Sequence, residues 1–158
     1  MIIEKLFLSP AHNYFGHHGA PAGATPVVEA DTLECVAGRG VRGDRFFDYR
    51  PDYAGQITFF SAEVFAELCA AVGAGGCSPG AVRRNVIVHG ADLNGLIGRE
   101  FELQSVWFRG AEECRPCYWI WVHPESRRHY LRVRSCIECM RAPLSFSPMG
   151  PCIPRKQF

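Results

Sequence analysis

Residues 56–60 read Gln-Ile-Thr-Phe-Phe and are followed by Ser61, and this segment decides the fold of the 158-residue chain. β-Branched and aromatic residues are enriched in strands, so residues 56–60 are predicted to form one. Ser61 is a favourable N-cap for a helix that begins directly after the strand. Gly73 ends this helix, since glycine readily adopts the left-handed conformation of a helix C-terminus. The apolar face of the helix then consists of Val64, Phe65, Leu68, Cys69 and Val72.

Further extended segments lie on both sides of this strand and helix. They are residues 3–8, 27–36, 85–89 and 100–108. Glycine and proline residues separate them and mark turns. Several short strands with one helix predict a β-rich α+β domain, with a β-barrel-like arrangement and few helices.

Length and composition indicate one globular domain with its own core. The hydrophobic fraction of 47% is that of a globular protein rather than of a disordered one. We find no run of apolar residues long enough to span a membrane and no secretory signal at the N-terminus, so we expect a cytoplasmic protein without a membrane partner.

The composition changes abruptly along the chain. Residues 1–113 carry 9 Lys and Arg against 14 Asp and Glu, whereas residues 114–158 carry 8 against 2. Fifteen of the 16 glycines lie at or before Gly110. We therefore predict a domain over residues 1–120 and an atypical basic tail over residues 121–158, rich in Pro, Arg and Cys. We expect this tail to be disordered or to result from a change of coding frame near residue 120.

Two cysteines, Cys114 and Cys117, are the strongest candidates for chemistry. They follow a predicted strand and flank Arg115 and Pro116. A neighbouring cation favours the thiolate, which is the reactive form of cysteine and a good ligand for a soft or high-valent metal.

The same cysteines allow a different interpretation. Cys114 and Cys117 are separated by 18 residues from a second pair, Cys136 and Cys139, which fits the spacing of a structural zinc site. The basic tail of such a zinc protein would bind nucleic acid, a partner that we do not expect from the remaining sequence. We interpret the other cysteines of the predicted domain as small apolar core residues, namely Cys35, Cys69 and Cys77.

Arginines and glycines form two further motifs. Residues 38–43 match the pattern G-x-G-x-x-G, but the following residues are poor helix formers, so we reject a dinucleotide site. The loop ends in Asp44-Arg45, which is suited to an anion. Arg83 and Arg84 precede Asn85 at the start of a predicted strand. They are expected either to form an internal salt bridge or to clamp a ligand.

Taken together, these motifs resemble the MOSC domain, named after the C-terminal part of molybdenum cofactor sulfurase. The matching segments, in the order of the family, are residues 3–10, 40–46, 55–58, 83–87, 90–98 and 114–118. The resemblance covers roughly residues 1–120 and implies a mixed β-barrel-like fold that binds molybdenum cofactor (molybdopterin).

The resemblance also assigns roles to individual residues. Cys117 corresponds to the cysteine that ligates molybdenum, and Cys114 is either a second thiol for sulfur transfer or a packing residue. The implied contacts to the anionic part of the cofactor are Arg45, Arg83, Arg84 and Asn85.

The implied activity is sulfur transfer or oxidoreductase chemistry at Cys117, and the alternative is a carrier of a metal–sulfur species that does not catalyse turnover. The only lysines are Lys5 and Lys156, so we do not expect pyridoxal phosphate in this chain. Sulfur or electrons would come from a partner, either a cysteine-desulfurase-like donor or a redox protein. After the cysteine pair, relatives continue with a Gly-rich segment that this chain lacks.

Overall fold

The computed structural model describes residues 1–13, 23–51, 53–71, 73–113, 137–141 and 151–152. Its one α-helix within these residues is α1, Ala62–Ala71, and two short 3-10 helices are η1, Pro79–Val82, and η2, Asn94–Leu96. The strands are β1 Ile2–Leu8, β2 Val28–Ala30, β3 Leu33–Val36, β4 Gly40–Val41, β5 Ile57–Ser61, β6 Val86–His89, β7 Glu100–Leu103, β8 Val106–Glu113, β9 Ile137–Arg141 and β10 Pro151–Cys152.

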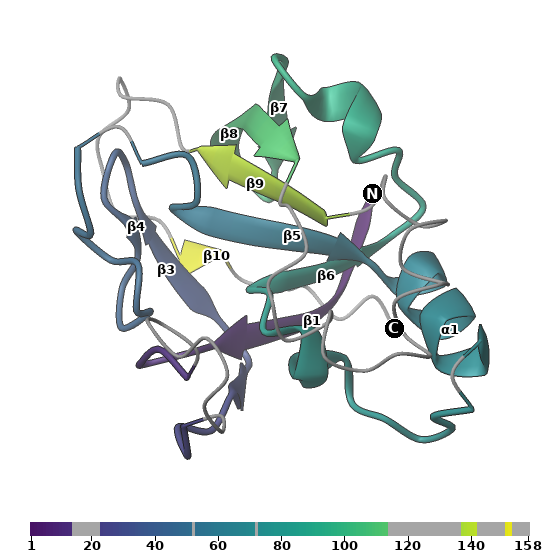
Figure 1. Cartoon of the computed structure of the whole chain (residues 1–158). Helices are drawn as coiled ribbons and strands as arrows, with labels where there is room; N and C mark the ends of the chain where they lie inside the picture. Colours follow the sequence, from purple (N-terminus) through teal and green to yellow (C-terminus); the bar gives the residue numbers. More distant parts are fainter. Residues whose placement is uncertain (14–22, 52, 72, 114–136, 142–150, 153–158) are drawn as a thin grey trace.

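Seven strands form the main sheet, in the order β2-β1-β6-β5-β9-β8-β7 (Figure 1). β5 and β6 run parallel, with Phe59 opposite Val86, and every other pairing in this sheet is antiparallel. All five residues of β5 are buried, because this strand lies at the centre of the sheet and both of its faces are covered. The strand predicted at residues 56–60 is confirmed, although it begins and ends one residue later, at Ile57–Ser61.

A smaller sheet has the order β10-β3-β4. With one α-helix and two sheets, the described chain is β-rich α+β, as predicted. The pairings between the described residues give two open sheets, so they do not show the closed barrel that the resemblance implied.

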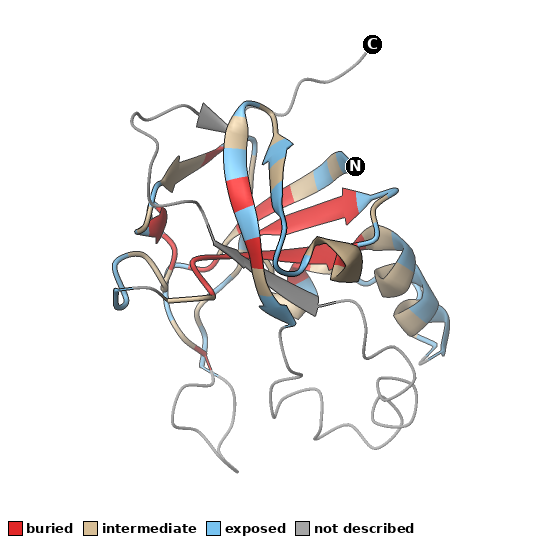
Figure 2. Cartoon of the chain, turned by 90° about the horizontal axis from the view of Figure 1, so that it is seen from above, coloured by how far each residue is buried: buried red, intermediate tan, exposed pale blue. Residues whose placement is uncertain are grey.

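The core consists of two apolar clusters whose members alternate along the central strands. Phe59, Val86 and Val88 belong to one cluster. Phe60 and Ile87, which directly follow Phe59 and Val86 in sequence, belong to the other cluster. Successive side chains of a strand point to opposite faces, so the two clusters lie on opposite sides of the sheet. Burial is concentrated on the central strands (Figure 2).

The helix α1 forms as predicted from its apolar spacing. The Ser61 Oγ accepts a hydrogen bond from the Val64 amide at 3.2 Å and so caps the first turn. Phe65 and Leu68 pack against the cluster around Phe60, and Gly73 ends the helix with a φ of 67°.

Two of the predicted strands are wrong in extent. Residues 27–36 form two strands, β2 and β3, rather than one. Residues 100–108 were expected to form a single strand, but the chain reverses at Gln104 and Ser105, which have φ values of 49° and 64°. Two successive positive φ values are typical of a type I′ hairpin turn, whose usual signal is Asn-Gly or Asp-Gly. Gln-Ser carries no such signal.

The end of the chain contributes strands to both sheets. β9 lies between β5 and β8, and β10 pairs with β3. These strands belong to the segment 121–158 that the sequence assigned to a separate tail. The boundary near residue 120 stays a prediction, as does the change of coding frame. Within the described residues, no helix is long and apolar enough to cross a membrane.

Gly110 is required by a close backbone approach, which gives a first prediction. A Cβ at this position would lie 2.1 Å from the Leu96 carbonyl oxygen. Gly110→Ala is therefore expected to lower the free energy of unfolding by at least about 2 kcal/mol. Gly75→Ala is the control, because its Cβ would meet no atom within 4 Å, and its effect should stay within about 0.5 kcal/mol. Urea denaturation measures both variants, and equal effects would contradict the close approach.

Glu63 gives a prediction on pH dependence. The hydrogen bond from the Ser61 hydroxyl, followed by that from the Gly90 amide, lowers the pKa of Glu63 to about 2. A lowered carboxyl pKa stabilises the fold above the unfolded pKa, and this contribution is lost as the pH falls from about 4.5 to about 2. Because the side chain is 42% exposed, Glu63→Gln should cost below about 1 kcal/mol at pH 7.

This cost should disappear near pH 2, where wild type and Glu63→Gln should unfold at the same urea concentration. Glu67→Gln, an exposed substitution on the same helix, should differ little from wild type at either pH. A cost for Glu63→Gln that does not change with pH would contradict the assignment.

Candidate functional site

The buried carboxylate of Asp44 joins three segments of the chain. Its Oδ2 accepts hydrogen bonds from the Ser9 amide at 3.1 Å and from the Asn85 side chain at 2.9 Å. Its Oδ1 accepts one from the Phe46 amide at 3.1 Å. The end of β1, the start of β6 and the loop after β4 therefore meet at one charged group, whose side chain is 1% exposed.

Asn85 continues this network toward β5. Its side-chain oxygen accepts hydrogen bonds from the Thr58 amide and hydroxyl at 3.1 and 2.8 Å. Its amide nitrogen donates to Asp44 and to the Phe7 carbonyl. The predicted role of Asn85 was a contact to cofactor. In the structure this buried side chain bonds to protein atoms on all sides and positions the loop that carries Arg45.

Arg45 is the most deeply buried cation of the site, with a side chain 8% exposed. Its Nη2 donates to the Arg83 carbonyl at 3.3 Å, and its Nη1 lies 3.6 Å from Asp44 Oδ2. This Nη1 is buried, and no atom among the described residues accepts a hydrogen bond from it. Burial lowers the pKa of Arg45, Asp44 opposes this effect, and the charges of Arg83 and Arg84 lower the pKa further.

The structure thus brings together the arginines that the sequence selected. Arg45 lies 3.6 Å from the Asp44 carboxylate, and Arg83 and Arg84 are close enough for their charges to lower the pKa of Arg45. We call these three residues the arginine cluster. An excess of guanidinium groups over carboxylates favours a bound anion, and guanidinium is well matched to phosphate.

Arg83 itself holds the loop that begins after β1. Its Nη1 donates to the Thr25 carbonyl at 3.1 Å and its Nη2 to the Ala11 carbonyl at 2.9 Å. Asn13 fixes the same loop by two hydrogen bonds with the backbone of Thr25. Arg83 has a φ of 52°, a conformation that is uncommon for residues other than glycine and that ends η1.

Aromatic rings cover one side of the arginine cluster. The Arg45 guanidinium lies 4.7 Å from the centre of the Phe46 ring, and His12 meets the same ring edge-on at 4.9 Å. Tyr53 lies 5.1 Å from Phe46 and 5.0 Å from Tyr49. Burial lowers the pKa of His12, and Arg45 lowers it further. Both effects oppose protonation of His12 beside the buried Arg45.

Residues at the end of β8 lie on the same rows of the sheet as Thr58 and Phe59. Burial raises the pKa of Tyr53, the charge of Arg45 lowers it, and the charge of Glu112 raises it, so both groups act on one hydroxyl. Strand register agrees, since Glu112 is opposite Cys139 of β9, and Cys139 is opposite Thr58 of β5. β8 therefore ends at Glu113 close to the row that contains Thr58. The next residue is Cys114, and the predicted site residues Cys114 and Cys117 lie outside the described part of the chain.

Sequence analysis missed three residues that build the site. Asp44 was noted only as a neighbour of Arg45, and neither His12 nor Tyr53 was selected. A polar residue at the start of a buried strand, such as Asn85, is itself a signal, because a buried amide requires hydrogen-bond partners. The sequence does not reveal which residues supply them.

The G-x-G-x-x-G motif does not form a dinucleotide site, as predicted. Gly40 and Val41 form β4, which pairs with β3 in a hairpin, so no helix follows the motif. Gly40 has a φ of 100°, and a Cβ there would lie 2.7 Å from the Gln56 carbonyl oxygen. Gly40 therefore allows the hairpin to pack against the start of β5.

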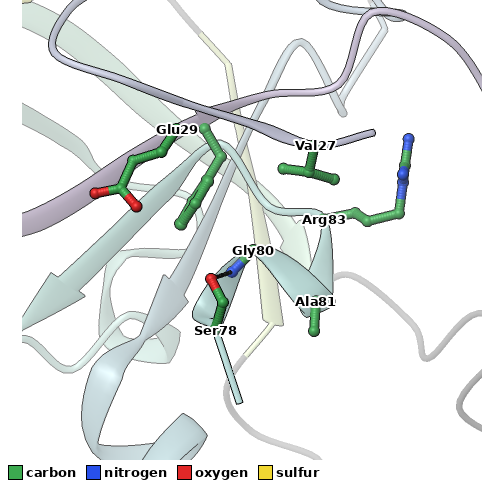
Figure 3. A pocket seen from close by; sticks show the side chains of 7 residues that line it. Val27, Glu29, Ser78, Gly80, Ala81 and Arg83 are labelled. Carbon is green, nitrogen blue, oxygen red and sulfur yellow. Dashed lines mark hydrogen bonds between the residues drawn. The ribbon is translucent and has the colours of Figure 1, made fainter. Parts of the chain in front are cut away.

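A separate pocket of about 530 Å³ lies beside η1. Figure 3 shows its polar edge at Ser78, whose Oγ accepts a hydrogen bond from Gly80, and at Glu29, whereas the Arg83 side chain extends away from Glu29. Glu29 is paired with Lys5 at 2.8 Å. The lining residues are Phe7, Val27, Glu29, Ser78, Gly80, Ala81 and Arg83.

No group of three His, Cys, Asp or Glu side chains in the described residues has the arrangement of a metal site. The geometry therefore defines a β-rich protein with a phosphate-compatible arginine cluster, next to the strand that leads into a cysteine pair. The chain belongs to the MOSC domain family, whose model matches residues 16–136. This family includes proteins that bind molybdenum cofactor.

Solved structures share the fold. The YUAD protein from Bacillus subtilis superposes with a TM-score of 0.63 at 19% identity, over 96% of this chain and 90% of that protein. The structure of a hypothetical protein superposes with a TM-score of 0.62 at 11% identity, over 96% of this chain and 64% of the other. A search of curated proteins gave no match.

The hydrogen bond between Asn85 and Asp44 gives a prediction on the pH dependence of stability. Asn85→Asp places a second carboxylate beside that of Asp44, where the amide nitrogen now donates at 2.9 Å. We expect a loss of at least about 3 kcal/mol at pH 7, and a smaller loss at pH 4, where one of the two carboxyl groups is protonated. Urea denaturation at both pH values measures the difference from wild type.

Asn85→Ala is the matched control, because it removes the same hydrogen bonds without adding a charge. Its cost of about 1–3 kcal/mol should change less between the two pH values than that of Asn85→Asp, because no second charge is added. If both variants responded to pH alike, the direct contact between Asn85 and the Asp44 carboxylate would be refuted.

Proposed function

We propose that this chain binds molybdenum cofactor, with the Cys117 thiolate as the metal ligand and the arginine cluster holding the anionic phosphate of the pterin. The observation that supports this proposal most directly is the buried Arg45 Nη1, which has no hydrogen-bond acceptor among the described residues. An unsatisfied buried donor on a charged group is costly, and a phosphate oxygen would satisfy it.

The residues present fit such a group. Arg45 lies 3.6 Å from Asp44 with its Nη1 donor unused among the described residues, and Arg83 and Arg84 add positive charge near it, which would favour a phosphate. Asp44 and Asn85 hold the Arg45 loop in place, so the guanidinium does not have to be ordered when the anion binds. A soft thiolate at Cys117 complements the metal end of the same molecule.

When bound, molybdenum cofactor supplies a centre for oxo or sulfur transfer. The chain would contribute the Cys117 thiolate as ligand and Cys114 as a second thiol, and the rings of Phe46 and Tyr53 would shield the arginine cluster from water. We propose a cysteine-desulfurase-like sulfur donor or a redox protein as the partner.

The test is to purify the protein from a host that makes the cofactor and to measure bound molybdenum and pterin by mass spectrometry. Wild type should carry both. Cys117→Ser should lose molybdenum by at least about tenfold, because a hydroxyl is a poor ligand for a soft site. Cys77→Ser changes an exposed cysteine that is distant from Cys117 in sequence. This variant should retain the molybdenum and pterin content of wild type.

Arg45→Lys tests the phosphate contact separately. It keeps the charge near Asp44 but loses the planar fork of donors, so pterin retention should fall while urea denaturation shows a folded protein. Molybdenum that is bound without any turnover would identify a carrier rather than an enzyme. One zinc per chain that depends on Cys136 and Cys139 would overturn the proposal.

A further inference from the structure

The C-terminal end of α1 turns the chain back on itself at Cys69. The Ala74 amide donates to the Cys69 carbonyl at 2.9 Å, and the Gly73 amide donates to the Ala70 carbonyl at 3.4 Å. With Gly73 at a φ of 67°, this is a Schellman motif, which reverses the chain direction at a helix end. The residues after α1 therefore return beside its last turn.

A second turn follows at once and ends at Cys77. The Cys77 amide donates to the Ala74 carbonyl at 3.4 Å, with Gly75 and Gly76 between them. Since Ala74 is already bonded to Cys69, the two turns in succession place Cys77 near the helix end that carries Cys69. Sequence analysis interpreted both cysteines as core residues. For Cys77 this is wrong, because its side chain is exposed, whereas Cys69 is partly buried.

The pKa of Cys69 agrees with this placement. Burial raises the pKa of Cys69, and the charge of Cys77 raises it further. The two turns and this effect both place Cys77 near Cys69. The exposed Cys77 is the better attacking group, and the partly buried Cys69 is suited to react second.

We propose that Cys69 and Cys77 form a dithiol site that is oxidised to an intramolecular disulfide by a low-molecular-weight disulfide such as glutathione disulfide. The Cys77 thiolate attacks one sulfur of glutathione disulfide, which releases one glutathione thiolate and leaves a mixed disulfide. The Cys69 thiolate then attacks the Cys77 sulfur and releases the second glutathione. Two protein thiols are thereby oxidised, and one glutathione disulfide is reduced to two glutathione molecules.

The surroundings allow the small adjustment that a disulfide requires. A Cβ added at Gly73, Gly75 or Gly76 would meet no atom within 4 Å, so the connecting segment lies in open space. Cys35 differs in this respect, because it lies in the paired strand β3 and packs against the core. Cys35 is therefore a natural internal control.

The disulfide would join α1 to the segment that carries Arg83. Ser78, next to Cys77, caps η1 through its bond with the Gly80 amide, and η1 ends at Arg83. A covalent bond at Cys77 would thus fix this segment from one end, while the Arg83 side chain fixes it at the other.

The sequence makes the test direct. Trypsin does not cleave between Arg50 and Pro51, so cleavage after Arg45 and Arg83 yields the peptide 46–83, in which Cys69 and Cys77 are the only cysteines. The full chain is equilibrated with glutathione buffers of increasing disulfide content, then alkylated and digested. We expect a peptide two hydrogens lighter than the reduced form and without alkyl groups, in at least about half of the molecules under the most oxidising buffer.

The same peptide from Cys77→Ser should stay alkylated at Cys69, and Cys35 in the wild-type digest should be alkylated at every buffer composition. The proposal is overturned if the wild-type peptide carries two alkyl groups in every buffer. It is also overturned if it carries glutathione on either cysteine without the internal bond, because that result would place the two thiols out of reach of each other.

Discussion

The hydrogen bond that the Asn85 side-chain amide donates to the Asp44 carboxylate is the contact on which the rest of the site depends. A carboxylate that is 1% exposed must be paired, because an isolated buried charge is prohibitively costly. The partners of Asp44 come from β1, β6 and its own loop, so satisfying one charge fixes three segments together. Asn85 then extends the same network to β5 through Thr58.

This arrangement determines what Arg45 is able to do. Asp44 draws the guanidinium into the interior, but its carboxylate oxygens are largely occupied by other donors. Arg45 Nη1 lies 3.6 Å from Asp44 Oδ2, and no described residue accepts a hydrogen bond from this nitrogen. Arg83 and Arg84 add charge of the same sign.

Local signals in the sequence predicted local structure well and long-range structure poorly. Ser61, the spacing of the apolar residues after it and Gly73 together predict the whole of α1, because capping and periodicity act within a few residues. The turn at Gln104 and Ser105 was missed, since its two positive φ values are imposed by the pairing of β7 with β8 rather than by the residue types. The arginine cluster was predicted through a family resemblance, whereas the role of Asp44 depends on tertiary contacts that no spacing encodes.

The topology brings strands that are far apart in sequence side by side in the main sheet. β5 and β6 are parallel, so both begin at the same end of the sheet, where Thr58 and Asn85 meet. β8 is antiparallel to β9, and β9 is antiparallel to β5, which makes β8 parallel to β5. The strand register places Glu112 on the same row of the sheet as Thr58. The charges of Glu112 and Arg45 both affect the pKa of Tyr53. β8 therefore ends at Glu113, on the same row of the sheet as Phe59, and the cysteine pair follows it directly in the sequence.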